Sequence, residues 1–138
     1  MAQAGWASGD ITPPLGLPMG GRGPRFAGGD KVLDRLEAQV TVLQDNKGRR
    51  LVWVSLDLIG MGYAQSAELR NELAGLLGAE PAGGILNFSH IHSGPMANFD
   101  KYAAEMERPA ALTAYLDMVG RKVKALGIEA MAKIRPVQ

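Results

Sequence analysis

The stretch LVWVSLDLIGMGYAQSAELRNELAGLLGAEPAGGILNFSH, residues 51–90, decides the fold of this chain because its hydrophobic period changes twice. Residues 51–59 are a nearly continuous apolar run rich in β-formers, which is typical of a strand covered on both faces. Four leucines then share one face of a predicted helix over 64–78: Leu69, Leu73, Leu76 and Leu77. Gly78 is well placed as the C-terminal cap of that helix. The apolar run at 84–89 predicts another short buried strand.

These three elements predict a βαβ unit, whose two strands run parallel. Parallel strands bring their C-terminal ends to one edge of the sheet, and ligands bind at that edge in open α/β sheets. Asp57 lies near the end of the first strand, and His90 and His92 follow the second. The sequence therefore predicts that three titratable side chains gather at one sheet edge.

His90 and His92 are the only histidines of the chain. Residues i and i+2 of extended backbone point to the same side, so both imidazoles can face one centre. One ring can then bind a metal while the other transfers a proton or forms a hydrogen bond. The residues alone leave a second interpretation open, in which the histidines are two polar residues at a strand end and Asp57 forms the turn there.

The flanking segments complete an α/β fold class. Alternating apolar residues over 36–42 predict a half-buried strand that forms an antiparallel hairpin with 51–59. Residues 93–109 are expected to be a loop, and an apolar stripe over 112–133 predicts a long amphipathic helix. Residues 1–30, rich in Gly and Pro, are expected to be irregular, with apolar anchors that favour an arm packed over the rest of the chain. One domain, 1–138, is expected.

Composition excludes several classes of site. The chain has no cysteine, which excludes disulfides, thiolate nucleophiles and Cys-type zinc sites. A net charge of +1 over 138 residues argues against a nucleic-acid surface. No apolar run approaches the ~20 residues of a membrane-spanning helix, and the N-terminus lacks the pattern of a signal peptide. A soluble protein, cytoplasmic as the chain stands, is expected.

A glycine-rich stretch and a group of basic residues can be explained without a binding function. The stretch GGRGPRFAGG, residues 20–29, lacks the lysine of a phosphate-binding loop and does not lie between a strand and a helix. Five basic residues mark the predicted last helix and its end: Arg121, Lys122, Lys124, Lys133 and Arg135. Their simplest role is to solvate that helix, and contact with an anionic membrane surface is the alternative.

Three stretches in this order resemble the neutral/alkaline (non-lysosomal) ceramidase family. SGDITPPLGLPMGGRG (8–23) is similar to the family's opening D-x-T-P-x-x-G…M-G-G-x-G, and LVWVSLDLIG (51–60) to its strand ending in Ser-x-Asp. ILNFSHIHSGPM (85–96) is similar to the signature T-H-T-H-S-G-P, the most specific part of the match. The end of the chain, IRPVQ, resembles the segment that precedes a second metal-binding histidine. The resemblance extends over essentially the whole chain.

The resemblance implies a zinc-dependent amidase that cleaves the N-acyl bond of ceramide and releases sphingosine and a fatty acid. It implies that His90 is a Zn²⁺ ligand and that His92 assists the reaction beside the metal. Asp57, from its place at the same sheet edge, is expected to be a catalytic residue as well. The resemblance also implies that the family's other ligands, a histidine, a glutamate and a tyrosine, lie in a remainder of the catalytic domain downstream. This chain is then expected to be inactive alone.

The sequence departs from the family pattern at four places. Ser89 and Ile91 replace the two threonines of the signature, Arg22 stands where the family commonly has tyrosine, and LDRL (33–36) lacks the histidine and proline of H-D-P-L. These changes leave another lipid or small-molecule amide open as the substrate. A catalytic zinc takes three protein ligands, so a non-catalytic binding module that keeps the first half of the fold is the alternative function.

Overall fold

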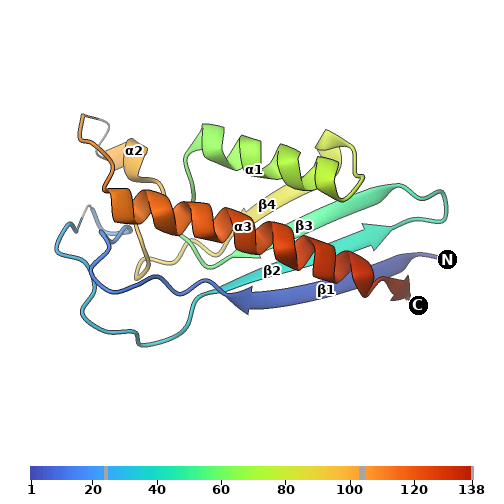
Figure 1. Cartoon of the computed structure of the whole chain (residues 1–138), viewed down its shortest axis with the longest axis horizontal. Helices are drawn as coiled ribbons and strands as arrows, with labels where there is room; N and C mark the ends of the chain where they lie inside the picture. Colours follow the sequence, from blue (N-terminus) through green and yellow to red (C-terminus); the bar gives the residue numbers. More distant parts are fainter. Residues whose placement is uncertain (24, 103–104, 138) are drawn as a thin grey trace.

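A five-stranded mixed sheet carries both long helices on one of its faces (Figure 1). The structure is a computed structural model that describes residues 1–23, 25–102 and 105–137. The strands, in the spatial order β4-β3-β2-β1-β5, are β1 (Gln3–Asp10), β2 (Glu37–Gln44), β3 (Arg50–Leu56), β4 (Gly84–Phe88) and β5 (Arg135–Pro136). The helices are α1 (Tyr63–Leu76), the 3-10 turn η1 (Pro81–Gly83), α2 (Phe99–Tyr102) and α3 (Ala110–Ala132).

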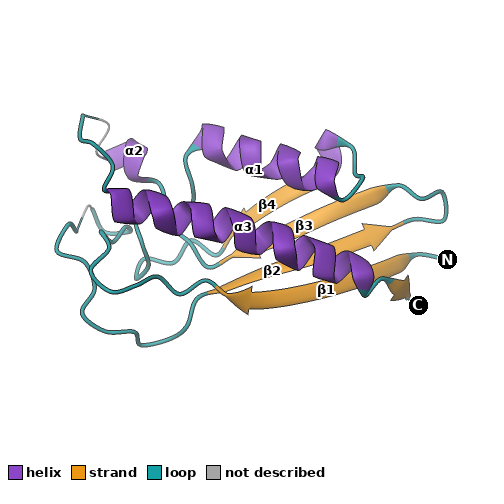
Figure 2. Cartoon of the chain, in the orientation of Figure 1, coloured by secondary structure: helices purple, strands orange, loops and turns teal. Residues whose placement is uncertain are grey.

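The central elements match the sequence prediction in order and direction, but not in burial. Residues 51–59 were expected to be covered on both faces and 84–89 to be buried, whereas Trp53 of β3 is 46% exposed and no residue of β4 is fully buried, because both long helices lie on one face of the sheet. Strands β2 and β3 form the antiparallel hairpin, and β3 pairs with β4 in parallel through the crossover helix α1. Gly78 ends α1 with a positive φ of 64°, as expected of a C-terminal cap. The α/β fold class with its βαβ unit and long last helix is confirmed (Figure 2).

The prediction that residues 1–30 are irregular is wrong for 3–10. These residues form β1, which pairs antiparallel with β2 along its whole length. The helix-facing side of β1 is made of small residues because α3 lies directly above it. A Cβ on Gly5 would stand 2.0 Å from the Ala130 carbonyl oxygen, so no larger side chain fits there. The strand therefore lacks the bulky alternation by which sequence analysis recognises a strand.

Three smaller elements were also missed, the first of them the 3-10 turn η1 between α1 and β4. The predicted loop 93–109 contains the single-turn helix α2, and the C-terminal residues of β5 pair with β1. Because β5 is two residues long, it has too little hydrophobic pattern to be recognised.

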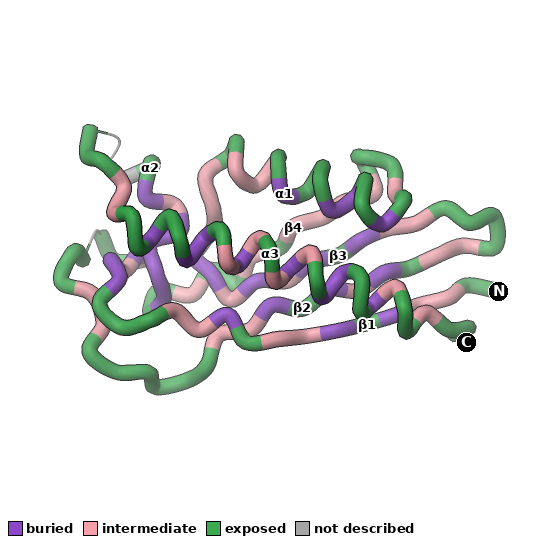
Figure 3. Tube along the Cα trace, in the orientation of Figure 1, coloured by how far each residue is buried: buried purple, intermediate pink, exposed green. Residues whose placement is uncertain are grey.

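The core lies between the sheet and the two long helices. The buried valines of β2 and β3 face the helix layer, in which α3 presents one apolar stripe to the sheet. These fully buried residues are Val40, Val42, Val52, Val54, Leu112, Leu116, Val119 and Val123. In Figure 3 the buried positions concentrate where α3 crosses the sheet. This packing holds the strands in place, and the histidines follow the end of β4 at the edge of the sheet.

The basic residues noted in the sequence are spread over α3, its C-terminal end and β5, where Arg135 lies, and Lys122 reaches toward Gly9 of β1. Lys124 forms an ion pair with Glu72 of α1 (2.9 Å), and Lys133 pairs with Glu129 one turn away (2.5 Å). The pairs are exposed, so each adds little to stability. Across the described ranges 1–23, 25–102 and 105–137, no helix is long and apolar enough to cross a membrane.

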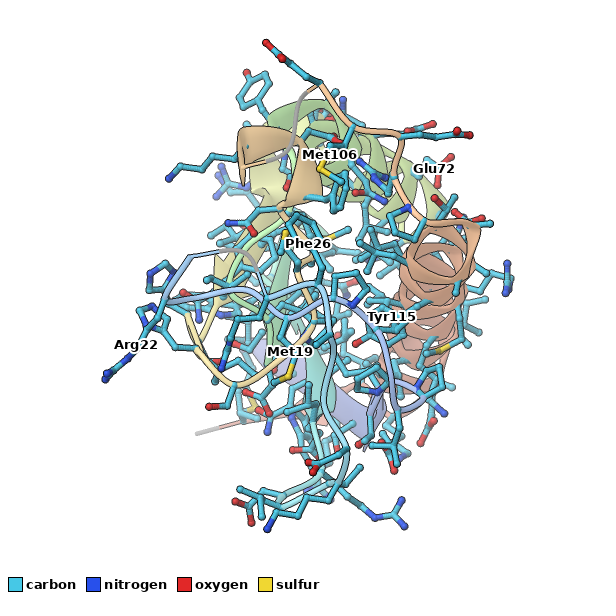
Figure 4. All side chains as sticks on the ribbon, turned by 90° about the vertical axis from the view of Figure 1, so that its left-hand side faces the viewer. Met19, Arg22, Phe26, Glu72, Met106 and Tyr115 are labelled. Carbon is cyan, nitrogen blue, oxygen red and sulfur yellow. The ribbon has the colours of Figure 1, made fainter. Side chains whose placement is uncertain are left out.

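The arm between β1 and β2 is packed rather than free. Ile11 is fully buried, and its carbonyl oxygen accepts a hydrogen bond from the hydroxyl of Tyr115 (2.7 Å), which extends from α3 toward the interior (Figure 4). Burial of that hydroxyl raises the pKa of Tyr115. Next to it, hydrogen bonds from Thr12, with help from Arg35, lower the pKa of Asp10 to about 2. The arm is thus anchored where it leaves β1.

Replacing Tyr115 by phenylalanine is expected to lower the free energy of unfolding by about 1–3 kcal/mol, because the buried carbonyl of Ile11 loses its partner. Urea denaturation of the purified protein measures the change. Tyr63→Phe is the control, since Tyr63 is 91% exposed. Equal unfolding midpoints for the two variants would contradict an anchoring role for the Tyr115 hydroxyl.

Candidate metal and catalytic site

The loop after β4 carries His90 and His92 and is called the histidine loop. It continues directly from β4 and is hydrogen-bonded to the end of β3. The Ser89 amide donates to the Leu56 carbonyl and the His90 amide to the Leu58 carbonyl, both at 3.0 Å. Parallel pairing thus extends beyond the strand ends, and it carries His90 to the C-terminal edge of the sheet. The edge predicted from the βαβ unit is where this histidine lies.

His90 adopts a backbone conformation that non-glycine residues rarely take. Its φ is 59°, and it is the only non-glycine residue of the described chain with a positive φ. A left-handed conformation costs of order 1–3 kcal/mol and persists only where surrounding contacts impose it. Such strain occurs preferentially at functional sites.

The imidazole of His90 is oriented by one hydrogen bond. Its Nδ1 lies 2.7 Å from the carbonyl oxygen of Ile59. Because a carbonyl oxygen can only accept, Nδ1 must carry the hydrogen, and the lone pair of the neutral ring is then on Nε2. Histidines that bind metals commonly donate their second N–H to a backbone carbonyl in this way. His90 is therefore prepared to bind through Nε2.

The two imidazoles lie together, although the backbone at His90 is left-handed and not extended as the H-x-H prediction assumed. Their ring centroids are 5.0 Å apart with an interplanar angle of 68°. Both side chains are exposed at the loop surface. At this separation, a group bound to one ring is within reach of a proton held by the other.

The N-terminal arm holds the histidine loop from the other side. Met19 pairs with both Arg25 and Pro95, and the Gly20 amide donates to the Gly94 carbonyl (3.1 Å). The arm passes so close that a Cβ on Gly21 would stand 2.6 Å from the Cα and Cβ of His92. The glycines of the arm thus permit contact between its backbone and His92.

Arg25 is the functional residue that sequence analysis missed. Its Nη2 donates to the carbonyl oxygens of Gly20 (2.8 Å) and His92 (2.6 Å), so it bonds arm and loop together. Arg22, three residues earlier, points away from the molecule (Figure 4). The only sequence signal was the apolar character of the arm, which predicts packing but does not identify its partner.

Arg25→Ala is expected to loosen the loop around His92 while the fold is kept, because both hydrogen bonds are made by the exposed guanidinium. Exchange of the Gly20 and Met96 amides, which donate to Gly94 and Pro18 across the same contact, is expected to rise about tenfold, equivalent to about 1.4 kcal/mol, close to the value of a hydrogen bond to a charged group. Arg22→Ala is the matched control. Unchanged exchange in the Arg25 variant would show that the remaining backbone pairing alone holds the loop.

A cavity of about 750 Å³ opens beside His90. Its walls come from segment 59–65, at the start of α1, and from Glu68, Asn98, Asp100, Lys101 and Arg108. Three buried polar atoms in these walls have no hydrogen-bond partner among the described residues: Oε1 of Gln65, Oδ1 of Asn98 and Nε of Arg108. Buried polar atoms without partners are costly, and a polar group in the cavity would bond to these three only after the side chains that cover them move.

A second groove, of about 460 Å³, lies beside the same loop and is mainly apolar. Ile91 and Ser93 line it, while His90 lines the polar cavity. Ile91, which replaces a threonine of the family signature, therefore adds apolar surface to the groove between arm and loop. The histidine loop has a polar cavity and an apolar groove at its sides.

Asp57 lies at the same end of the sheet, directly after β3. Its carboxylate oxygen Oδ2 accepts a hydrogen bond from the Glu37 amide (3.0 Å), and its own amide donates to the Glu37 carbonyl (3.0 Å). These bonds extend the β2–β3 ladder by one residue. The observed contact is structural, and a catalytic role for Asp57 stays a prediction.

Comparison with protein-family models gave no match for this sequence, and comparison with curated proteins gave none either. Among solved structures, the neutral ceramidase from Pseudomonas aeruginosa matches with a TM-score of 0.69 at 20% sequence identity. The fold is ceramidase-like. The match covers 98% of this chain and 22% of that chain, so this chain spans about a fifth of the ceramidase's length. The fold expected from the sequence resemblance is confirmed.

Within this ceramidase-like fold, His90 is the residue whose orientation fits a metal ligand. His90 has the tautomer and orientation of a zinc ligand, since its Nδ1–H is bound and its Nε2 is available. Across residues 1–23, 25–102 and 105–137, no group of three or more potential ligands comes together. His90 therefore fits zinc as one ligand, and further ligands would have to come from outside the described residues.

Proposed function

We propose that this chain is the N-terminal part of a zinc-dependent amide hydrolase of the neutral ceramidase type. The reaction would convert N-acylsphingosine, or a related lipid amide, to an amine and a fatty acid. The observation that carries the proposal is the pose of His90: a strained residue at the sheet edge whose Nδ1 is bound to Ile59. The ceramidase-like fold supports the same assignment.

His90 would supply one zinc ligand through Nε2. Bound zinc lowers the pKa of a coordinated water to about 7 and polarises an amide carbonyl. His92, 5.0 Å from His90 between ring centroids, would accept the proton of the attacking water and give it to the departing amine. Asp57 would support the edge by fixing the end of β3 against Glu37.

The chain would act as a single but incomplete domain, 1–138. The other zinc ligands would come from the remainder of the catalytic domain, since the described residues contain no group of three potential ligands. Contact with a membrane surface through the basic residues of α3 would bring the site to a lipid substrate.

A non-catalytic binding module is the second candidate function. The same incomplete ligand set favours it, because two histidines alone cannot form the three-ligand site of a catalytic zinc. In that case the cavity beside His90 would bind a polar group without hydrolysing it.

Three measurements on the native gene product test the proposal. Its intact mass is expected to exceed 14.7 kDa, its zinc content to be one per chain, and a fluorescent N-acylsphingosine to release its fatty acid. Zinc with hydrolysis of a different lipid amide would correct the substrate and keep the reaction. A product of 14.7 kDa with neither zinc nor amidase activity would favour the binding module.

A further inference from the structure

His90 is hydrogen-bonded to two consecutive residues of the segment that follows β3. Its amide donates to the Leu58 carbonyl (3.0 Å), and its Nδ1–H donates to the Ile59 carbonyl (2.7 Å). In extended backbone the direction of the carbonyls alternates from one residue to the next. Both carbonyls can therefore face His90 only because the chain turns after β3, where the Leu58 amide donates back to the Leu56 carbonyl (2.9 Å).

Gly60, directly after these two residues, has a φ of 141°. Glycine adopts such positive values readily, whereas residues with a side chain rarely do. Apart from its chain neighbours, no atom of the described chain lies within 4 Å of the place that a Cβ on Gly60 would take. The position therefore requires glycine for its backbone conformation and not for lack of space.

The φ angle of residue 60 sets the orientation of the peptide group between Ile59 and Gly60. The carbonyl oxygen of this peptide is the one that accepts from Nδ1 of His90. The Ile59 side chain is 4% exposed and lies against the arm, where its Cγ2 would be 3.3 Å from a Cβ on Gly20. Because Ile59 is fixed in this way, a residue that brings φ at position 60 to a negative value would turn the peptide and move its oxygen away from the ring.

We infer that Gly60 is a positioning residue for His90, which keeps the Ile59 carbonyl bound to Nδ1–H and thereby leaves Nε2 free for a metal. The nitrogen that binds a metal is determined by the hydrogen bond that the other nitrogen makes. The part of the inference that concerns zinc rests on the proposed function, whereas the orientation of the ring does not. Gly62, two residues later at the start of α1, has an ordinary φ of −57°, so the requirement is specific to position 60.

Gly60→Ala in the native gene product tests the inference, with Gly48→Ala as the matched control. Gly48 lies in the turn between β2 and β3, at the opposite end of the sheet from His90 (Figure 1). Its φ is 81°, and a methyl added there also meets no atom of the described chain within 4 Å, apart from its neighbours. Both variants thus place a methyl group in open space on a strained backbone, and only one of them is next to the Ile59 carbonyl.

Nitrogen NMR of ¹⁵N-histidine-labelled protein, at a pH where the imidazoles are neutral, distinguishes a ring nitrogen that carries a hydrogen from one that does not. The signals of His90 are assigned by their loss in His90→Ala. In the parent and in Gly48→Ala, Nδ1 of His90 is expected to carry the hydrogen. In Gly60→Ala, a substantial part of the hydrogen is expected to move to Nε2, and zinc affinity is expected to fall about 10–100-fold, as when other metal ligands lose their hydrogen-bond partner.

If Gly60→Ala does not fold, Gly60→Asn replaces it. Asparagine adopts a positive φ more readily than other residues with a side chain, so the fold is kept more easily. Its favoured positive value is about +57°, so the peptide still turns and the same change of tautomer is expected.

An unchanged tautomer in the Gly60 variant would overturn the inference, and so would an equal change in Gly48→Ala. A changed tautomer with unchanged zinc affinity would show that the Ile59 bond does not prepare the ligand. The tautomer is measured without zinc or substrate, so position 60 is tested even when the gene product is no amidase. Conversely, an active zinc amidase whose Gly60→Ala variant keeps its tautomer refutes only the role of Gly60.

Discussion

Replacing His90 by alanine is expected to remove zinc and amide hydrolysis together from the native gene product. The variant loses the Nε2 lone pair that the Ile59 hydrogen bond directs outward. Because changes outside the ligand set already lower metal affinity 10–100-fold, loss of a ligand is expected to lower it by at least about 100-fold. Zinc per chain and fatty-acid release from N-acylsphingosine are the two measurements.

His92→Ala provides the contrast that separates the two histidines. His92 is expected to assist proton transfer rather than bind, so this variant keeps its zinc while its rate falls by about 10²–10⁴-fold. A native zinc content in the His90 variant would contradict the ligand assignment. Loss of zinc in both variants would show that the two rings bind the metal jointly.

The location of the candidate site was predictable, but its detailed geometry was not. Periodicity predicted the βαβ unit, and that topology alone brings the end of β4 to the edge beside β3. The tautomer of His90 depends on the Ile59 carbonyl, thirty-one residues away in the chain. No local pattern encodes which carbonyl meets a ring nitrogen, because that contact follows from the packing of two strand ends.

The contribution of the arm was hidden for a related reason. Sequence analysis identified an apolar arm that packs, yet Arg25 acts through backbone carbonyls of Gly20 and His92. Every residue has a backbone carbonyl, so the sequence does not show which residues such an arginine will bind. The close approach of Gly21 to His92 could not be predicted either, because a glycine in a Gly-rich arm first indicates flexibility.

In strand β1, close packing against a helix removes the alternation of bulky and polar residues by which a strand is recognised. Strands are recognised by bulky residues alternating with polar ones, whereas β1 places Gly5 and Ala7 against α3. The helix crosses so closely that small size, and not hydrophobicity, is what the position requires. The missed strand and the close contact between Gly5 and α3 therefore have one cause.

Gly5→Ala is expected to lower the free energy of unfolding by at least about 3 kcal/mol, the upper end for overpacking a core. The added methyl would lie 2.0 Å from the Ala130 oxygen and 3.0 Å from the Ile134 nitrogen. Both are backbone atoms of α3 and its C-terminal end, so the clash can be relieved only by moving the helix away from the sheet. Since domains are stable by about 5–15 kcal/mol, soluble yield should fall as well. Urea denaturation measures the loss.

Gly75→Ala is the matched control, because it makes the same chemical change in a different environment. Gly75 lies within α1, and apart from its neighbours and the backbone of its own helix no atom of the described chain comes within 4 Å of the place that its added methyl would take. Alanine there should therefore stabilise the helix by about 0.5–1 kcal/mol. The two identical substitutions are thus expected to shift the unfolding midpoint in opposite directions. A Gly5 variant as stable as the parent would mean that α3 can rise from β1 at little cost. Packing against α3 would then not explain why these residues of β1 are small.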